Sequence, residues 1–485
     1  MNAIRSNTTR SRIVVAAVGL PLTALGTVVA VRAELGLAEV LAGIFVVGLL
    51  VTLFLIPVHW LPAASLLILA FVPSRFIPND GPFRALTPLT AIILIWVFRR
   101  LVLRQSPPAD AADLPPLQIR GARLFVYVPV VFVLLWLGYS LVTSMLPNIS
   151  ASWSISFLSA VIAPMLVPDS RAEGILLRKS LMWAGALLGA YAIIEMVLQT
   201  SPIYGTINDL LGRLVTEERT WSVYRAMAAF SHPLFAAAFF TVPAALALAT
   251  WMQTGRLRYL VCAGLSTLGI FGTVSRGALL AVAASAIVVF FASLFNPTVR
   301  VRSRMLGFAL LGVAAIVFAA NFAPLQERAD SIEAVRSSQT RELGVIVALK
   351  TAAYYGWLGS GAGTSGMATD RYKDIPIENS GMQLLVSIGI PGVIAVLALL
   401  GGLVVNALAV RDVGAAAAVV ALTVAFAGFN VIDAVYYMHA LIGIVVMLSV
   451  SSFAPLPTPM KTAAEVARTP LRSLTPSITG GSPWT

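Results

Sequence analysis

The chain has 485 residues, of which 58% are apolar and 11% charged, and its mean hydropathy is +0.89. A water-soluble domain carries nearer a quarter charged residues, so the composition excludes a soluble enzyme and predicts an all-α polytopic bundle of transmembrane helices. The net charge of +12 does not indicate a nucleic-acid partner, because the basic residues stand in short clusters between apolar runs, where they orient a membrane protein.

The first apolar run follows Arg5, Arg10 and Arg12, an order that superficially resembles a secretory signal. Apolar segments continue along nearly the whole chain, so we predict that this run is retained as the first membrane helix. A spanning helix needs about 17–25 residues, and we expect 12–14 spans, the lower number applying if two short segments near a Pro-rich stretch do not cross. In chain order the segments are 13–31, 37–56, 60–72, 86–98, 124–145, 152–167, 181–198, 226–251, 257–273, 278–295, 306–322, 384–405, 415–432 and 435–452.

Lys and Arg are distributed unevenly across this layout. With the N-terminus in the cytoplasm, internal segments hold 20 of the 33 basic residues and external segments hold 13, six of them in one long loop that contributes little to orientation. In short segments the bias is therefore 20 against 7. We expect residues 1–452 to form one polytopic domain of the inner (plasma) membrane with both termini cytoplasmic, and 453–485, rich in Pro, Ser and Thr, to form a disordered cytoplasmic tail.

Two predicted extracytoplasmic segments are long, 199–225 and about 323–381. Within the second, 340–355 has helical periodicity and is expected to lie on the membrane surface. Its apolar face is formed by Leu343, Ile346, Val347, Leu349 and Ala353. A Gly-rich turn at 359–363 follows.

The usual catalytic and cofactor motifs are absent: the chain has no Walker loop, no HExxH and no CxxC, so we expect no metal and no cofactor. The single cysteine, Cys262, is expected to be a small buried hydrophobic residue. Three arginines of the predicted outer side stand out, Arg225, Arg276 and Arg341. A guanidinium presents a fixed fork of donors that suits phosphate oxygens. The alternatives are an interfacial anchor for the first, a hairpin cap reaching lipid headgroups for the second, and a solvated helix face for the third.

Four motifs in order resemble the O-antigen ligase and O-antigen polymerase superfamily. The segment 225–236 (RAMAAFSHPLFA) is similar to that family's Arg-containing start of a helix, and 273–280 (TVSRGALL) to its Ser-Arg-Gly helix start. Arg341 with 356–363 (GWLGSGAG) resembles its Arg and Gly-x-Gly loop, and 378–392 (ENSGMQLLVSIGIPG) its element beginning His-Asn. The resemblance covers roughly residues 225–392.

The resemblance implies an inverting, metal-independent glycosyltransferase. Such enzymes take a glycan from a polyprenyl diphosphate-linked donor at the outer leaflet and pass it to the hydroxyl of a glycan or lipid-glycan acceptor, among membrane lipids. The same resemblance implies two catalytic arginines, Arg225 and Arg341. It also implies five candidate substrate-binding residues: Arg276, His232, Asn379, Gly361 and Gly363. Preorganised arginines suit the charge that grows on a departing diphosphate.

Glu378 stands where the family commonly has histidine. A carboxylate also serves as a general base, so we predict that Glu378 lies beside Arg341 and activates the acceptor hydroxyl. The alternative is that Glu378 caps the helix that begins near Asn379. The departure favours a polymerase or ligase of another surface polysaccharide over conventional ligation to lipid A.

Other polar residues are weaker candidates. His232, before a proline, is either a helix-start hydrogen-bonder or a participant, and Glu195 and the Asp433/His439 pair are candidates to line a sugar-binding cavity. Two rival functions remain, a flippase or transporter of lipid-linked glycan and an inactive scaffold of an envelope polysaccharide assembly complex. A flippase is expected to carry polar groups deep in several helices. In this sequence the polar candidates instead gather at one predicted face of the membrane and in the long outer loop.

Overall fold

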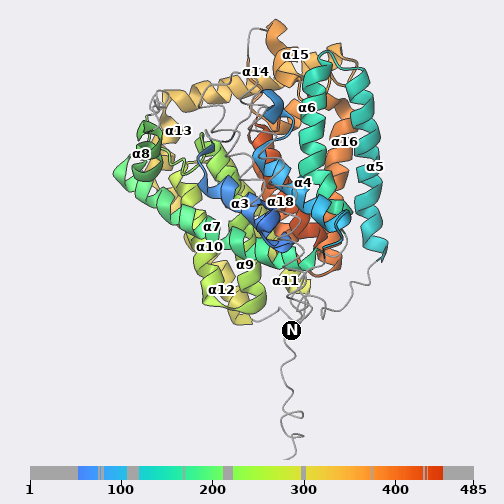
Figure 1. Ribbon diagram of the computed structural model, residues 1–485. Coiled ribbons are helices and arrows are strands. Elements are labelled where there is room, and N and C mark those ends of the chain that lie inside the picture. Colours follow the sequence, from blue (N-terminus) through green and yellow to red (C-terminus); the bar gives the residue numbers. More distant parts are fainter. Residues whose placement is uncertain are drawn as a thin grey trace, which may run out of the picture.

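The computed structural model describes residues 53–74, 77, 81–105, 120–167, 170–210, 222–295, 302–372, 375–429, 432–433 and 435–451. Within these ranges every element is helical, as predicted, and the helices form one bundle (Figure 1). The predicted span 13–31, nearly all of 37–56 and the tail 453–485 lie outside the described residues.

The principal helices follow the apolar segments along the chain. They are α3 (Leu61–Phe71), α4 (Pro88–Leu101), α5 (Arg120–Val142), α6 (Pro147–Phe157), α7 (Arg171–Leu198), α8 (Pro202–Leu210), α9 (Pro233–Thr254), α10 (Leu257–Gly272), α11 (Arg276–Phe295), α12 (Arg302–Asn321), α13 (Ala323–Asp330), α14 (Ile332–Tyr354), α15 (Ser365–Thr369), α16 (Ser380–Ala409), α17 (Val413–Ala427) and α18 (His439–Val450). Among the described residues, seven helical segments are long and apolar enough to cross a membrane, and four shorter ones are similarly apolar. The chain is therefore a multi-pass membrane protein.

The core is centred on α9, which packs against α7, α10, α11 and α17. Its inward surfaces are largely alanine, and most of its residues are buried. Small side chains let helix backbones approach closely, which is how helices associate where both lipid and protein are apolar. By contrast, the apolar stretch of α12 buries no residue within the protein, as expected of a helix surrounded by lipid.

One end of the bundle gathers basic residues that were predicted to be cytoplasmic. Arg178 at the start of α7 donates to the buried carboxylate of Asp412, which precedes α17, with Nη1 and Oδ1 3.0 Å apart. Arg304 at the start of α12 donates to the carbonyl of Met252 near the end of α9. The opposite end of the bundle carries α13, α14 and α15 (Figure 1). Arg178 and Arg304 thus lie at the end of the bundle opposite α14 and α15 (Figure 1), and which side of the membrane each end faces stays a prediction.

The start of α9 differs from the prediction. The helix begins at Pro233 and not at residue 226, because the ring of His232 caps it and a proline occupies its first position. Residues 225–232 form an irregular segment in front of the helix. Arg225 therefore lies in a loop that is held by neighbouring elements.

The surface helix is also longer than predicted, since α14 runs from Ile332 to Tyr354. Of the five residues predicted to form its apolar face, Val347 is buried with Ala348 and Ala352. The other four are exposed: Leu343, Ile346, Leu349 and Ala353. The buried face contains small residues that allow α14 to pack on α16. Four of the five residues predicted to form the apolar face are therefore exposed, and Val347 alone belongs to the buried side.

The Gly-rich turn packs against a break in α16. Gly389 interrupts the helix with φ 68°, and the amide of Ile390 donates to the carbonyl of Trp357 at 2.9 Å. A Cβ on Gly359 would lie 2.5 Å from the carbonyl oxygen of Ser387, so only glycine allows this approach. Two of the motifs, the Gly-x-Gly loop and the segment ending in Ile-Pro-Gly, are thus two sides of one packed junction.

Candidate functional site

Three segments converge on one cleft at the α14 end of the bundle. Arg225 precedes α9, Arg276 is the first residue of α11, and Arg341 lies on α14. All three line a cavity of about 240 Å³, together with Arg328 of α13. The arginines that stood out in the sequence are therefore brought together, although they are far apart along the chain.

The Ser-Arg-Gly motif builds one wall of this cleft. The hydroxyl of Ser275 accepts from the amide of Ala278 at 3.4 Å, which starts α11. Arg276 is exposed at the cavity, and a Cβ on Gly277 would lie 3.3 Å from the ring of Phe429, which also lines the cleft. The motif thus combines a helix cap, a guanidinium in the cleft, and a small residue that admits an aromatic ring.

Arg328 is the member that the sequence analysis missed. It lies in a stretch of mixed charges, and nothing in its neighbours distinguishes it from a solvated residue. Leu325, one turn earlier on α13, packs with Phe271 and Val274, and this contact brings α13 over the α10–α11 junction. Burial lowers the pKa of Arg328, and Arg341 and Arg276 lower it further, while Glu333 and Glu378 oppose the shift.

Arg225 is the most buried of the four, at 4% exposure. Its Nε donates to the carbonyl of Thr273 at 3.0 Å. Burial lowers its pKa to about 9, and the like charges of Arg328 and Arg341 add to this effect, while Glu333 opposes it. The guanidinium is still charged at neutral pH, so the cleft holds several cations in partly buried positions. An anion bound there would offset the electrostatic cost of this arrangement.

Glu378 lies beside Arg341, as predicted, with its Oε2 3.0 Å from the arginine Nε. The cap of α16 is Asn379, whose Oδ1 accepts from the amide of Met382 at 3.0 Å. The alternative that Glu378 caps this helix was therefore wrong. Asn379 uses its side-chain oxygen for the helix, and the carboxylate of Glu378 is 29% exposed beside Arg341. Neither Asn379 nor Glu378 lines the arginine cleft itself.

The remaining predicted substrate-binding residues lie elsewhere. His232 caps α9, its Nδ1 accepting from the amide of Leu234 at 3.2 Å, and burial lowers the pKa of the ring to about 4. Gly361 and Gly363 have positive φ and are buried against α6, where a Cβ would overlap Ser150 or Trp153. None of these three lines the arginine cleft.

The weaker candidates are internal. Glu195 is fully buried near the end of α7 and bonds to the loop that carries Arg225. Asp433 accepts from Ser387, and His439 bonds to Ser156 at 3.0 Å and to the carbonyl of Ile432 at 2.9 Å. The last two therefore stabilise the segment before α18 and do not line the cleft. Among the described residues, no group of three or more His, Cys, Asp or Glu side chains is placed to hold a metal ion.

Comparison with known proteins adds one match. Residues 261–397 match the family model described as O-antigen ligase, a segment that includes Arg276, Arg328, Arg341 and Glu378 but begins after Arg225. No curated protein matches the chain by sequence. The match, which covers less than half of the chain, and the helical membrane architecture together support membership of the O-antigen ligase superfamily, a family that suggests a glycosyl-transferring enzyme.

Proposed function

We propose that the protein transfers a glycan from a polyprenyl diphosphate carrier to an acceptor hydroxyl at the outer face of the membrane, as a polymerase or ligase of a cell-surface polysaccharide. The observation that carries this proposal is the cleft lined by Arg225, Arg276, Arg328 and Arg341. Four arginines from four segments of the chain suit the oxygens of two linked phosphates, because each guanidinium presents donors in a planar fork.

The size of the cleft indicates that it encloses only part of the donor molecule. About 240 Å³ is smaller than the 300–1,000 Å³ or so of a pocket that encloses a drug-sized ligand. The cleft therefore suits the diphosphate and the first sugar, while the prenyl chain lies in the bilayer and the rest of the glycan extends outward.

The proposed reaction is a single displacement at the anomeric carbon. The acceptor oxygen forms the new glycosidic bond, the bond from that carbon to the phosphate oxygen breaks, and polyprenyl diphosphate leaves with the electron pair. Negative charge grows on the leaving group, and Arg225 and Arg341 stabilise it in place of a metal ion. Arg276 and Arg328 orient the second phosphate. The acceptor proton passes to the carboxylate of Glu378, which does not line the cleft but is paired with Arg341, a residue that does.

A reconstituted transfer assay tests this function. Purified protein in nanodiscs receives a polyprenyl diphosphate-linked oligosaccharide and an acceptor glycan, and both the lengthened glycan and the released carrier are measured. We expect one carrier released per bond formed, and loss of both products in Arg225→Lys. The matched control is Arg258→Lys, at the exposed start of α10 on the other end of the bundle, which should keep full turnover. In liposomes, movement of intact donor between leaflets without release would instead support a flippase. No turnover with any donor would support a scaffold.

A further inference from the structure

The loop that carries Arg225 is held by a buried carboxyl group outside the cleft. Glu195 is fully buried near the end of α7. Its Oε2 accepts from the amides of Ala228 at 2.8 Å and Met227 at 3.2 Å, and its Oε1 accepts from the hydroxyl of Tyr224 at 3.4 Å. One side chain thus bonds to residues on both sides of Arg225.

This turn needs such an anchor because its backbone is unusual. Ala228 has φ 50°, in the left-handed region that residues other than glycine rarely adopt. The amide of that same residue makes the shortest of the Glu195 bonds. The carboxyl group therefore stabilises the conformation that lets the chain reverse between Arg225 and α9.

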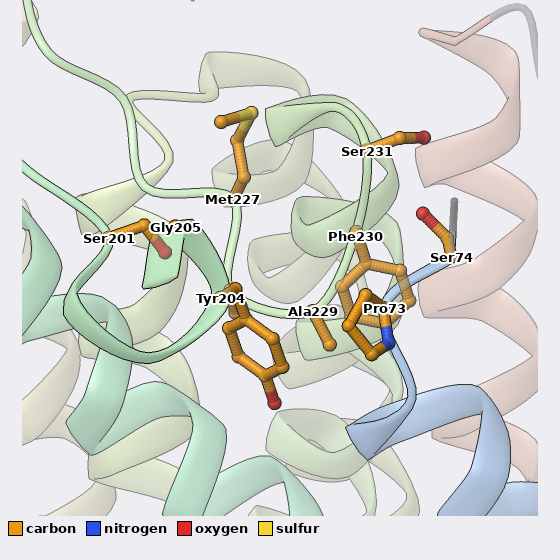
Figure 2. Close-up of a pocket in the computed structure, with 10 residues that line it drawn as sticks. Pro73, Ser74, Ser201, Tyr204, Gly205, Met227, Ala229, Phe230 and Ser231 are labelled. Carbon is orange, nitrogen blue, oxygen red and sulfur yellow. The ribbon is translucent and has the colours of Figure 1, made fainter. Parts of the chain in front are cut away.

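The other side of this segment has a small cavity and one further hydrogen bond, from the amide of Ser74 to the carbonyl of Ala229 at 2.8 Å. A cavity of about 20 Å³, enough for a water-sized group, lies between the segment from Met227 to Ser231 and α8, and Tyr204 and Ser201 border it (Figure 2). Toward α10, the amide of Ala226 donates to the carbonyl of Gly272 at 2.8 Å. The turn is therefore held by hydrogen bonds to α7 and α10, and the residue that follows it, Ala229, is bonded to Ser74 beside the cavity.

We infer that Glu195 is a positioning residue, which holds the 224–228 turn so that the Arg225 guanidinium meets the departing diphosphate. The inference rests on the proposed function, because it gives Arg225 a task in the reaction. Glu195 itself does not line the arginine cleft and touches no reacting atom in this scheme.

The test compares two replacements of one side chain. Glu195→Gln keeps a carbonyl oxygen for the two amides and should retain turnover within about threefold, whereas Glu195→Leu keeps the size and removes every acceptor. Misplacing a reacting group by about 1 Å can lower the rate on the order of 100-fold. We therefore expect the Leu variant to lose 10- to 100-fold in kcat, with little change in KM, per folded protein. Equal kcat for Glu195→Leu and wild type, or a Gln variant as slow as the Leu variant, would overturn the inference.

The matched control lies on the same helix. Glu173 is also fully buried on α7, but it pairs with Arg100 at 3.2 Å and with Trp96 at the other end of the bundle. Glu173→Leu should therefore reduce the folded yield without lowering kcat per folded protein. If Glu173→Leu lost as much kcat as Glu195→Leu, the loss would reflect the removal of any buried carboxyl group from α7. That result would contradict the positioning role of Glu195.

A double variant separates this inference from the proposed function. If Glu195 acts through Arg225, Glu195→Leu combined with Arg225→Lys should be no slower than Arg225→Lys alone, within about threefold, because residues that act as a unit are not additive. Fully additive losses overturn the positioning role. If Arg225→Lys has reduced turnover but Glu195→Leu has wild-type turnover, only the positioning role of Glu195 is overturned. If Arg225→Lys has wild-type turnover, the catalytic role proposed for the arginine cleft is overturned.

Discussion

Replacing Glu378 by glutamine separates catalysis from folding, because the two contributions of this carboxylate differ greatly in size. Its ion pair with Arg341 spans 3.0 Å, but the side chains are 29% and 50% exposed. Exposed ion pairs contribute about 0.2–1 kcal/mol to stability. Asn379 and not Glu378 caps α16, so the substitution removes no helix cap. We expect thermal unfolding of Glu378→Gln to resemble that of the wild type.

The effect on the reaction should be far larger. General-base assistance contributes about 10²- to 10⁴-fold, which corresponds to roughly 2.7–5.4 kcal/mol in the activation barrier. Glutamine keeps the shape and a hydrogen-bond acceptor but cannot take the acceptor proton. We therefore expect single-turnover glycan transfer to slow at least 100-fold, with partial recovery in Glu378→His.

A neighbouring carboxylate provides the control. Glu342 is exposed on α14, one residue from Arg341, and Glu342→Gln should transfer glycan at the wild-type rate. The assay is carrier release in a quenched single turnover, normalised to folded protein. Wild-type transfer by Glu378→Gln would refute the reasoning, and the acceptor-activating group would then have to be sought elsewhere in the chain.

Three further results are expected. Arg341→Lys should lose 10- to 100-fold in transfer rate because a point charge cannot reproduce two-pronged phosphate contacts to the departing diphosphate. Arg276→Lys should lose less than about tenfold, because its proposed task is only to orient the second phosphate; equal losses would contradict these separate roles. The pKa of His232 is lowered to about 4, so the unfolded chain binds a proton near pH 6.5 that the folded chain does not, and stability should fall by roughly 1–2 kcal/mol between pH 7 and pH 5. His232→Asn, which also caps a helix, should lose part of this acid sensitivity in thermal unfolding, and an unchanged pH profile would contradict it. Cysteines placed in 323–381 and in 99–123, after the single native cysteine is replaced, should react with an impermeant maleimide from opposite sides of the membrane; labelling from the same side would overturn the layout.

Much of this architecture follows from local sequence properties. Helix positions were predictable because a spanning helix must be a long apolar run, and the chain contains little else. Three arginines were recognisable because they stand on the predicted outer side and within motifs that resemble those of a known family: Arg225, Arg276 and Arg341. Glu378 was predicted to lie beside Arg341 because it stands just before a helix start and after a Gly-rich turn. The 3.0 Å ion pair confirms this prediction.

The features that were not predictable depend on contacts between distant segments. Arg328 reaches the cleft only because Leu325 packs on the α10–α11 junction, and its immediate neighbours are ordinary surface charges. The task of Glu195 depends on a turn some thirty residues away, as in its hydrogen bond to Ala228. On α14, Val347 packs inward while the other four residues of the predicted apolar face are exposed, because helical periodicity alone cannot show which neighbours a helix will meet.

If the arginine cleft binds the diphosphate of the donor, the purified protein should bind polyprenyl diphosphate, and its affinity for this lipid can be measured. Each charged hydrogen bond contributes about 1.5–3 kcal/mol, so we predict that polyprenyl diphosphate binds at least tenfold more tightly than polyprenyl monophosphate. The double variant Arg225→Lys/Arg328→Lys should lose this preference while retaining its fold. Equal affinity for the two lipids in the wild type, or a diphosphate preference that survives in the double variant, would contradict the account.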